Sequence, residues 1–191
     1  MEVTGVDFST EAIGRCRVAY PKAEFVECDA SSLPFPDGSF DLVTAVHVLE
    51  NLEDGRLEEA ASEIGRVLAP GGYLFVRCFT PDDMRSGDSR NGIFYRYYRP
   101  EDVLELFAGM DVVSSERKDE PTRFGTVRSR AECLFRKRSR TDGRQERRGS
   151  EQQASPDGRP HGVGRHMRPY LQDEVPKLVG GRPDVVLRHY G

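Results

Sequence analysis

The sequence has no long run of apolar residues. Its longest, Leu42 to Leu49, is interrupted by Thr44 and His47, whereas a membrane-spanning helix needs about 20 apolar residues. The acidic first residues do not resemble a signal peptide. We therefore expect a cytoplasmic protein with no membrane partner.

Cysteines are few and far apart. The chain has Cys16, Cys28, Cys78 and Cys133, and no C-x-x-C pair. This spacing argues against a zinc site and against a disulfide framework, and it fits a reducing cytoplasm.

Lysine is also scarce, and the charge is divided unevenly along the chain. Residues 1–135 carry 15 basic against 25 acidic side chains, a net charge of −10, whereas residues 136–191 carry 13 against 7, a net charge of +6. The second segment is rich in Arg, Gly and Pro and has little apolar periodicity, which predicts a disordered basic tail. An arginine run can bind nucleic acid, but without interleaved aromatics a solvated tail is favoured.

What residues 1–135 do contain is an alternation of strand and helix signals. Buried-strand patterns and helical spacing of apolar residues follow one another as strand 3–7, helix 12–20, strand 23–28, strand 39–49, helix 57–68, strand 73–79, helix 100–107, and strands 110–116 and 131–137. This order predicts an α/β domain with a doubly wound sheet. The last two strands have only an irregular connection between them, so we expect them to pair with each other.

Polar residues follow the predicted strands at their carboxyl ends. Asp7 ends the first strand, Asp29 follows the second, and Val46–His47 closes the third. In an open α/β sheet, ligands bind beyond the carboxyl ends of the strands, where the strand order reverses. We therefore expect these residues to converge on one ligand.

Four stretches occur in an order typical of one family. They are "GVDFS" (5–9), "FVECDASSLPFPDGSFDLVTAVHVLENL" (25–52), "EIGRVLAPGGYLFV" (63–76) and the final strand pair. Together they resemble the class I S-adenosylmethionine-dependent methyltransferases, particularly the ubiquinone-biosynthesis-like small-molecule group. The resemblance covers about residues 1–135 and implies a Rossmann-like methyltransferase sheet, with S-adenosylmethionine as cofactor and a small-molecule methyl acceptor.

The resemblance also implies how the cofactor would be held. Asp7 would accept hydrogen bonds from the ribose hydroxyls, and Phe8 would pack on the adenine. Asp29 would accept from the adenine amino group, the Ala30 N–H would reach a ring nitrogen, and the backbone near Val46 would lie close to the methionine moiety. The alternatives are that Asp7 merely caps the following helix, that Asp29 does the same for the Ser31–Ser32 turn, and that Phe8 is a core residue.

No catalytic base is evident, and methyl transfer by in-line displacement can rest largely on positioning. His47 is the one histidine in the predicted core, where it is either a base or a wall of the pocket. Tyr95, Arg96 and Tyr97 fall where this family places acceptor-side elements, and they suit an anionic or aromatic acceptor. The alternative is a surface loop whose aromatic side chains pack on the core.

One family feature is missing from the start of the sequence. The family's first strand, with its acid-x-Gly-x-Gly-x-Gly turn, would lie between the strand ending at Asp7 and the strand at 40–46. Neither "HGVGR" (161–165) nor "VGGRP" (179–183) follows an apolar strand. We therefore expect a truncated or frame-disrupted methyltransferase with an unfilled gap in its sheet and negligible affinity for the cofactor.

Two functions remain open at this point. The first is S-adenosylmethionine-dependent methyl transfer to a small molecule. The second is a non-catalytic remnant or interaction module that keeps the fold. A short-chain nicotinamide-dependent reductase is excluded because no lysine stands four residues after any tyrosine.

Overall fold

The computed structural model describes residues 2–53, 55–86, 95–139 and the backbone of residues 184–188. The elements in chain order are β1 (Val3–Asp7), α1 (Thr10–Ala19), β2 (Glu24–Glu27), β3 (Phe40–Val46), the 3-10 helix η1 (Leu49–Asn51), α2 (Arg56–Val67), β4 (Leu68–Phe79), α3 (Pro100–Leu106), β5 (Asp111–Pro121), β6 (Val127–Arg136) and β7 (Asp184–Arg188). The elements predicted within residues 3–137 are all present, with shifted ends.

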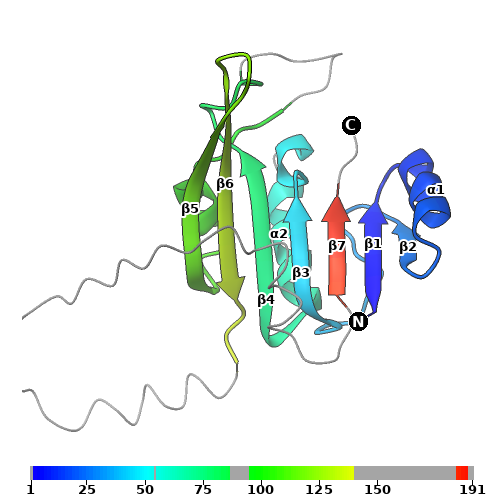
Figure 1. Ribbon diagram of the computed structural model, residues 1–191. Coiled ribbons are helices and arrows are strands. Elements are labelled where there is room, and N and C mark those ends of the chain that lie inside the picture. Colours follow the sequence, from blue (N-terminus) through cyan, green and yellow to red (C-terminus); the bar gives the residue numbers. More distant parts are fainter. Residues whose placement is uncertain (1, 54, 87–94, 140–183, 189–191) are drawn as a thin grey trace, which may run out of the picture.

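The strands form one 7-stranded sheet in the order β2-β1-β7-β3-β4-β6-β5 (Figure 1). From β2 to β4 the neighbouring strands run parallel, whereas β6 is antiparallel to β4, and β5 is antiparallel to β6. The doubly wound α/β class is therefore confirmed, and so is the pairing of the last two strands.

The Pro70-Gly71-Gly72 segment shows why the fourth strand begins earlier than predicted. Helix α2 passes directly into β4, and the register with β3 shifts between the Phe40–Leu68 and Leu42–Tyr73 pairs. A Cβ on Gly72 would lie 2.9 Å from the carbonyl oxygens of Ala69 and Asp41, and Gly71 has φ +82°. Glycine is therefore required at this irregularity.

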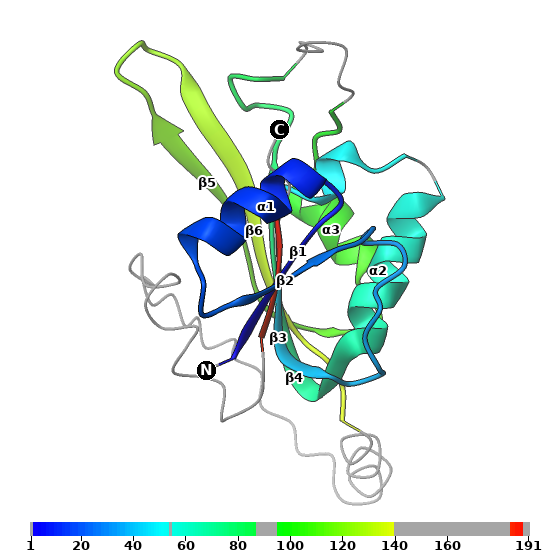
Figure 2. The same cartoon turned by 90° about the vertical axis from the view of Figure 1, so that its right-hand side faces the viewer.

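The helices cover the sheet in two groups. Helices α2 and α3 lie on the same side of the sheet, while α1 lies toward the other side at the β1–β2 end (Figure 2). Ser9 caps α1, because its hydroxyl oxygen accepts a hydrogen bond from the Ala12 N–H. Among the described residues, no helix has the length and apolar character needed to cross a membrane.

Strand β7 corrects the expectation of an unfilled gap. It lies between β1 and β3 and pairs in parallel with both, with Gly5 opposite Val186 on one side and Thr44 opposite Val186 on the other (Figure 1). Residues 185–187 are Val-Val-Leu, a composition that suits a central parallel strand. This strand was not predicted from the sequence, because its apolar run is short and follows a long polar segment. No helical pattern lies beside it, so no strand–helix unit can be recognised. The predicted disorder of the tail concerns mainly residues 140–183, which lie outside the described residues.

Candidate functional site

A hollow of about 240 Å³ opens beyond the carboxyl ends of β1 and β2. Its lining residues are Val6, Asp7, Phe8, Cys28, Asp29, Ala30, Val48, Asn51, Leu52, Glu53 and Arg56. It adjoins the point where the strand order reverses, the usual ligand position in such sheets. The predicted residues Asp7, Phe8, Asp29 and Ala30 thus come together, whereas Val46 ends β3 without lining the hollow.

Asp7 uses one carboxylate oxygen for a local turn and leaves the other without a partner. Its Oδ1 accepts a hydrogen bond from the Ser9 N–H at 2.8 Å and so orders the turn into α1, whereas the residue that caps this helix is Ser9. The residue is 7% exposed, and Oδ2 is buried with no hydrogen-bond partner among the described residues. A buried acceptor without a partner is costly.

Asp29 has both carboxylate oxygens engaged. Oδ1 accepts from the N–H and the hydroxyl of Ser31 at 2.9 and 2.7 Å, and Oδ2 accepts from Arg56 Nη2 at 2.6 Å. Burial acts to raise the pKa of Asp29, but the hydrogen bonds from Ser31 and the charge of Arg56 outweigh it and lower that pKa. Burial, with the nearby Asp29 charge, raises the pKa of the Cys28 thiol to about 11.

Phe8 is 61% exposed, so the alternative that it is a core residue is wrong. It lines the hollow together with the two acids. An exposed ring beside two carboxylates suits a flat heteroaromatic ligand that also carries hydrogen-bond donors.

The wall formed by Val48, Asn51, Leu52, Glu53 and Arg56 was missed from the sequence. After β3 the chain turns through η1 and returns over the hollow before α2 begins. The position of this segment directly after a strand's carboxyl end was the available signal. No signal in the sequence could have predicted the Arg56–Asp29 ion pair, because it joins residues far apart in the sequence.

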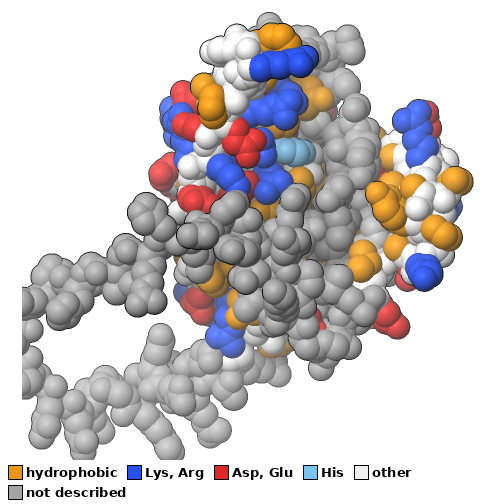
Figure 3. All heavy atoms as spheres, viewed as in Figure 1, with side chains coloured by type: hydrophobic (Ala, Val, Ile, Leu, Met, Phe, Trp, Pro, Cys, Tyr) orange, Lys and Arg blue, Asp and Glu red, His pale blue; other side chains and the backbone are white. Residues whose placement is uncertain are grey.

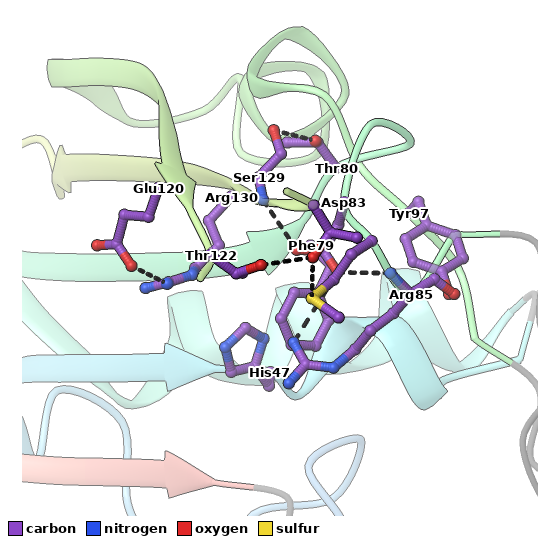
Figure 4. Close-up of polar contacts among 12 residues, drawn as sticks. His47, Phe79, Thr80, Asp83, Arg85, Tyr97, Glu120, Thr122, Ser129 and Arg130 are labelled. Atoms are coloured by element: carbon purple, nitrogen blue, oxygen red, sulfur yellow. Dashed lines mark hydrogen bonds and ion pairs between the residues drawn. The ribbon is translucent and has the colours of Figure 1, made fainter. Parts of the chain in front are cut away.

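A second cluster lies beside the hollow around His47, at the end of β3. His47 Nδ1 is 2.8 Å from Glu50 Oε1. Its ring stacks on Phe79, with the centroids 3.9 Å apart and the planes at 18° (Figure 4). The Arg85 guanidinium carbon lies 4.5 Å from the Phe79 centroid, within cation–π range.

The segment at Tyr95–Tyr98 folds back onto this second cluster. The Tyr97 hydroxyl donates to the Arg85 carbonyl oxygen at 2.5 Å, and the Arg96 N–H donates to the Glu50 carbonyl oxygen at 2.8 Å. Burial raises the pKa of Tyr98 to about 12. Tyr95 is half-buried, and no contact places it in either cluster. These two hydrogen bonds tie Arg96 and Tyr97 to the segments around Glu50 and Arg85, while Tyr98 packs on the core, as the loop alternative expected.

Comparisons with known proteins agree with this geometry. Residues 1–76 match the model of a methyltransferase domain family. A demethylmenaquinone methyltransferase of Thermus thermophilus is 41% identical over 116 residues, which cover 57% of this chain and 48% of the relative. The chain thus spans less than half the length of the curated relatives it matches first.

Solved structures show the same fold. An S-adenosylmethionine-dependent methyltransferase of Methanosarcina mazei aligns with a TM-score of 0.63 at 22% identity, covering 72% of this chain and 82% of the other. The N-methyltransferase NodS of Bradyrhizobium japonicum, in complex with S-adenosyl-L-homocysteine, aligns with a TM-score of 0.58 at 21% identity, covering 71% and 66%.

Residues 1–76 thus resemble a methyltransferase domain, and the sheet has the fold of S-adenosylmethionine-dependent methyltransferases. The sequence matches support a class I methyltransferase of the ubiquinone-biosynthesis type, a family whose cofactor is S-adenosylmethionine. Among the described residues, no group of His, Cys, Asp and Glu has the arrangement of a metal site.

Proposed function

We propose that the chain carries out methyl transfer from S-adenosylmethionine to a small molecule, and that the hollow beside β1 and β2 holds the adenosine half of the cofactor. The observation that carries this proposal is the buried Asp7 Oδ2, which has no partner among the described residues and belongs to a residue that lines the hollow. When bound, the cofactor supplies an electrophilic methyl group.

The residues of the hollow fit an adenosine group in chemical kind. Asp7 Oδ2 is an acceptor for a ribose hydroxyl, and the exposed Phe8 ring is a surface for the adenine. Asp29 fits less simply, because Arg56 holds its second oxygen. An adenine amino group would share that oxygen with Arg56 or displace it.

The methionine end of the cofactor has fewer protein groups to meet. The printed sequence contains no acid-x-Gly-x-Gly-x-Gly turn, so backbone N–H groups of that kind are not supplied to the methionine carboxylate. The expectation of negligible binding also rested on a gap in the sheet, and β7 removes that second reason. We therefore expect weak rather than negligible binding of the cofactor, with the contacts made through its adenosine half.

The acceptor we propose is a small aromatic molecule, and the cytoplasm is the proposed place of action. The acceptor rests on the aromatic and cationic side chains of Phe79, Tyr97 and Arg85 beside the hollow, and on the demethylmenaquinone methyltransferases among the relatives. The compartment rests on the free thiols of all four cysteines.

Calorimetry with S-adenosylhomocysteine and 5′-methylthioadenosine tests the proposal. The two should bind within about threefold of each other, because the adenosine half supplies nearly all of the contacts. Asp7→Ala should weaken both by about 10-fold or more, since a hydrogen bond to a charged group contributes about 1.5–3 kcal/mol. The matched control is Glu11→Ala, which removes an exposed acid from neighbouring α1 and should change nothing.

The second candidate function is a non-catalytic remnant, and the Arg56–Asp29 pair favours it, because it closes one predicted cofactor acceptor. If neither nucleoside binds to the wild-type chain, the remnant is the better account. If Arg56→Gln then restores binding, the pair is what blocks the site.

A further inference from the structure

His47 has an unusual backbone that fixes where its ring lies. Its φ is +57°, a left-handed conformation that is uncommon for residues other than glycine and is found disproportionately at functional sites. The His47 N–H still donates to the Arg77 carbonyl oxygen at 2.9 Å. The chain therefore turns sharply at the end of β3 and sets the imidazole against Phe79.

Glu50 fixes which ring nitrogen of His47 carries the proton. Its side chain is 1% exposed, and Oε1 accepts a hydrogen bond from the Phe79 N–H at 2.9 Å. An oxygen that already accepts from an amide is best matched by a second donor, so the Nδ1 atom, 2.8 Å away, carries the proton. The Nε2 atom then keeps its lone pair and is the acceptor.

This pair lies on the far side of a short turn from the hollow. The residue after His47 is Val48, which lines the hollow, and so does Asn51 after Glu50. The Glu50 carboxylate instead contacts His47 and the Phe79 N–H, and the His47 ring lies against Phe79 (Figure 4). The His47 side chain is 29% exposed, so an acceptor that approaches from solvent on this side of the turn can reach it.

We propose that His47 is the general base for an acceptor that carries an acidic hydroxyl, of the phenol or enol class, with Glu50 as its positioning residue. This rests on the proposed methyl transfer. Nε2 takes the hydroxyl proton, and the Arg85 guanidinium near Phe79 stabilises the oxyanion. An electron pair of the oxyanion, or of the conjugated carbon, forms the new bond to the methyl group, and the S–CH3 electron pair leaves with sulfur. Where carbon is methylated, its proton is lost afterwards to solvent.

Nitrogen-15 NMR of the full chain tests the positioning part without any turnover. The His47 signals are assigned by their loss in His47→Gln. The wild type and Glu50→Gln, which keeps an acceptor oxygen, should show His47 protonated on Nδ1 when neutral. Glu50→Leu should shift it to the Nε2-protonated form. The matched control is Glu63→Gln, which changes a carboxylate on α2 that accepts hydrogen bonds from the Leu33 N–H and from Arg66, and it should leave the wild-type form. An Nε2-protonated His47 in the wild type overturns the inference, whether or not Glu50→Leu folds.

The acceptor class is tested with 1-naphthol and 1-methoxynaphthalene in the presence of S-adenosylhomocysteine. We expect 1-naphthol to move the Nε2 resonance of His47 and the methyl ether, which has no hydroxyl proton, to leave it in place. An equal response to both, or no response to 1-naphthol, overturns the base role. Calorimetry of S-adenosylhomocysteine reports separately on the cofactor site, so the two failures are distinguishable. Where methyl transfer to 1-naphthol is measurable, His47→Gln should lower kcat by about 10²–10⁴-fold with little change in KM.

Discussion

Strand β7 separates two flanks of the sheet, β1–β2 with α1 and β3–β4 with α2, and the helix of the second flank buries more apolar side chains than the helix of the first. On the β1–β2 flank, α1 buries Ala12 and Ile13 but leaves Val18 85% and Tyr20 62% exposed, and apolar side chains are visible over α1 (Figure 3). On the β3–β4 flank, α2 buries Leu57, Ala60, Ala61, Ile64 and Val67. The acids that suit the adenosine half therefore stand on the thinly packed flank, and the His47 cluster stands on the well-packed flank.

The two flanks meet through β7 and through polar contacts of α2. β1 and β3 each pair with β7 rather than with each other. From α2, Arg56 forms an ion pair with Asp29, Glu63 Oε2 accepts a hydrogen bond from the Leu33 N–H at 2.8 Å, and Arg66 Nη2 donates to the Leu33 carbonyl oxygen at 2.9 Å. The acids of the hollow thus depend on both β7 and α2 for their position, while the side chains of the His47 cluster contact one another directly.

The largest expected effect is on stability in the well-packed flank. Phe135 is 0% exposed and packs 5.4 Å, centroid to centroid, from Phe107. Phe135→Ala should lower the free energy of unfolding by about 3–5 kcal/mol, because it removes a buried ring and leaves a cavity. Phe124→Ala is the control, since Phe124 is 75% exposed, and it should change stability by no more than about 0.5 kcal/mol. Urea unfolding measures both, and equal effects would contradict the difference in burial.

A smaller and more local effect should follow from breaking β7. Val186→Pro places a residue without an N–H, and with a fixed φ, in a strand that pairs on both sides. We expect a local cost of about 3 kcal/mol. Hydrogen exchange should then show β1 and β2 losing protection, while β4, β5 and β6 keep theirs.

The control for this experiment is Val179→Pro, outside the paired residues of β7. It should leave all strands protected. Unchanged protection of β1 in Val186→Pro would mean that the β1–β2 flank does not need β7, and the comparison between the flanks would lose its basis.

The sequence predicted the parts of this fold that depend on local pattern. The helical spacing from Leu57 to Val67 and the continuous apolar strand at 40–46 were sufficient to place α2 and β3, because periodicity reports directly on burial. The acids Asp7 and Asp29 were placed in one hollow because the carboxyl ends of parallel strands meet at one edge of the sheet.

The parts that the sequence did not predict depend on long-range contacts. β7 joins the sheet from far along the chain, and no local pattern says which strand edge a short apolar run will meet. The His47–Glu50 contact lies within a few residues, but its meaning comes from the Phe79 N–H, which β4 brings in from 29 positions away from Glu50. The direction in which a side chain such as Glu50 points is set by tertiary packing, and the periodicity of the sequence does not report it.

The smallest expected effect concerns the ion pair that links the flanks. The pKa of Asp29 is lowered in the folded chain, so its contribution to stability is present above the pKa of the unfolded state, about 3.9, and is lost as the pH falls through the folded value. Arg56→Gln removes the opposing charge but leaves the hydrogen bonds from Ser31. The pKa of Asp29 should therefore rise only part of the way to its ordinary value, as followed by NMR titration of the carboxyl carbon. The stability lost at neutral pH should stay below about 1 kcal/mol, because the pair is partly exposed, and the difference from the wild type should vanish in acid.

Arg15→Gln removes a charge from an exposed pair on α1 and should leave the Asp29 titration unchanged. If Arg56→Gln and Arg15→Gln raise the pKa of Asp29 equally, the net charge of the whole protein lowers that pKa, and the direct contact with Arg56 does not.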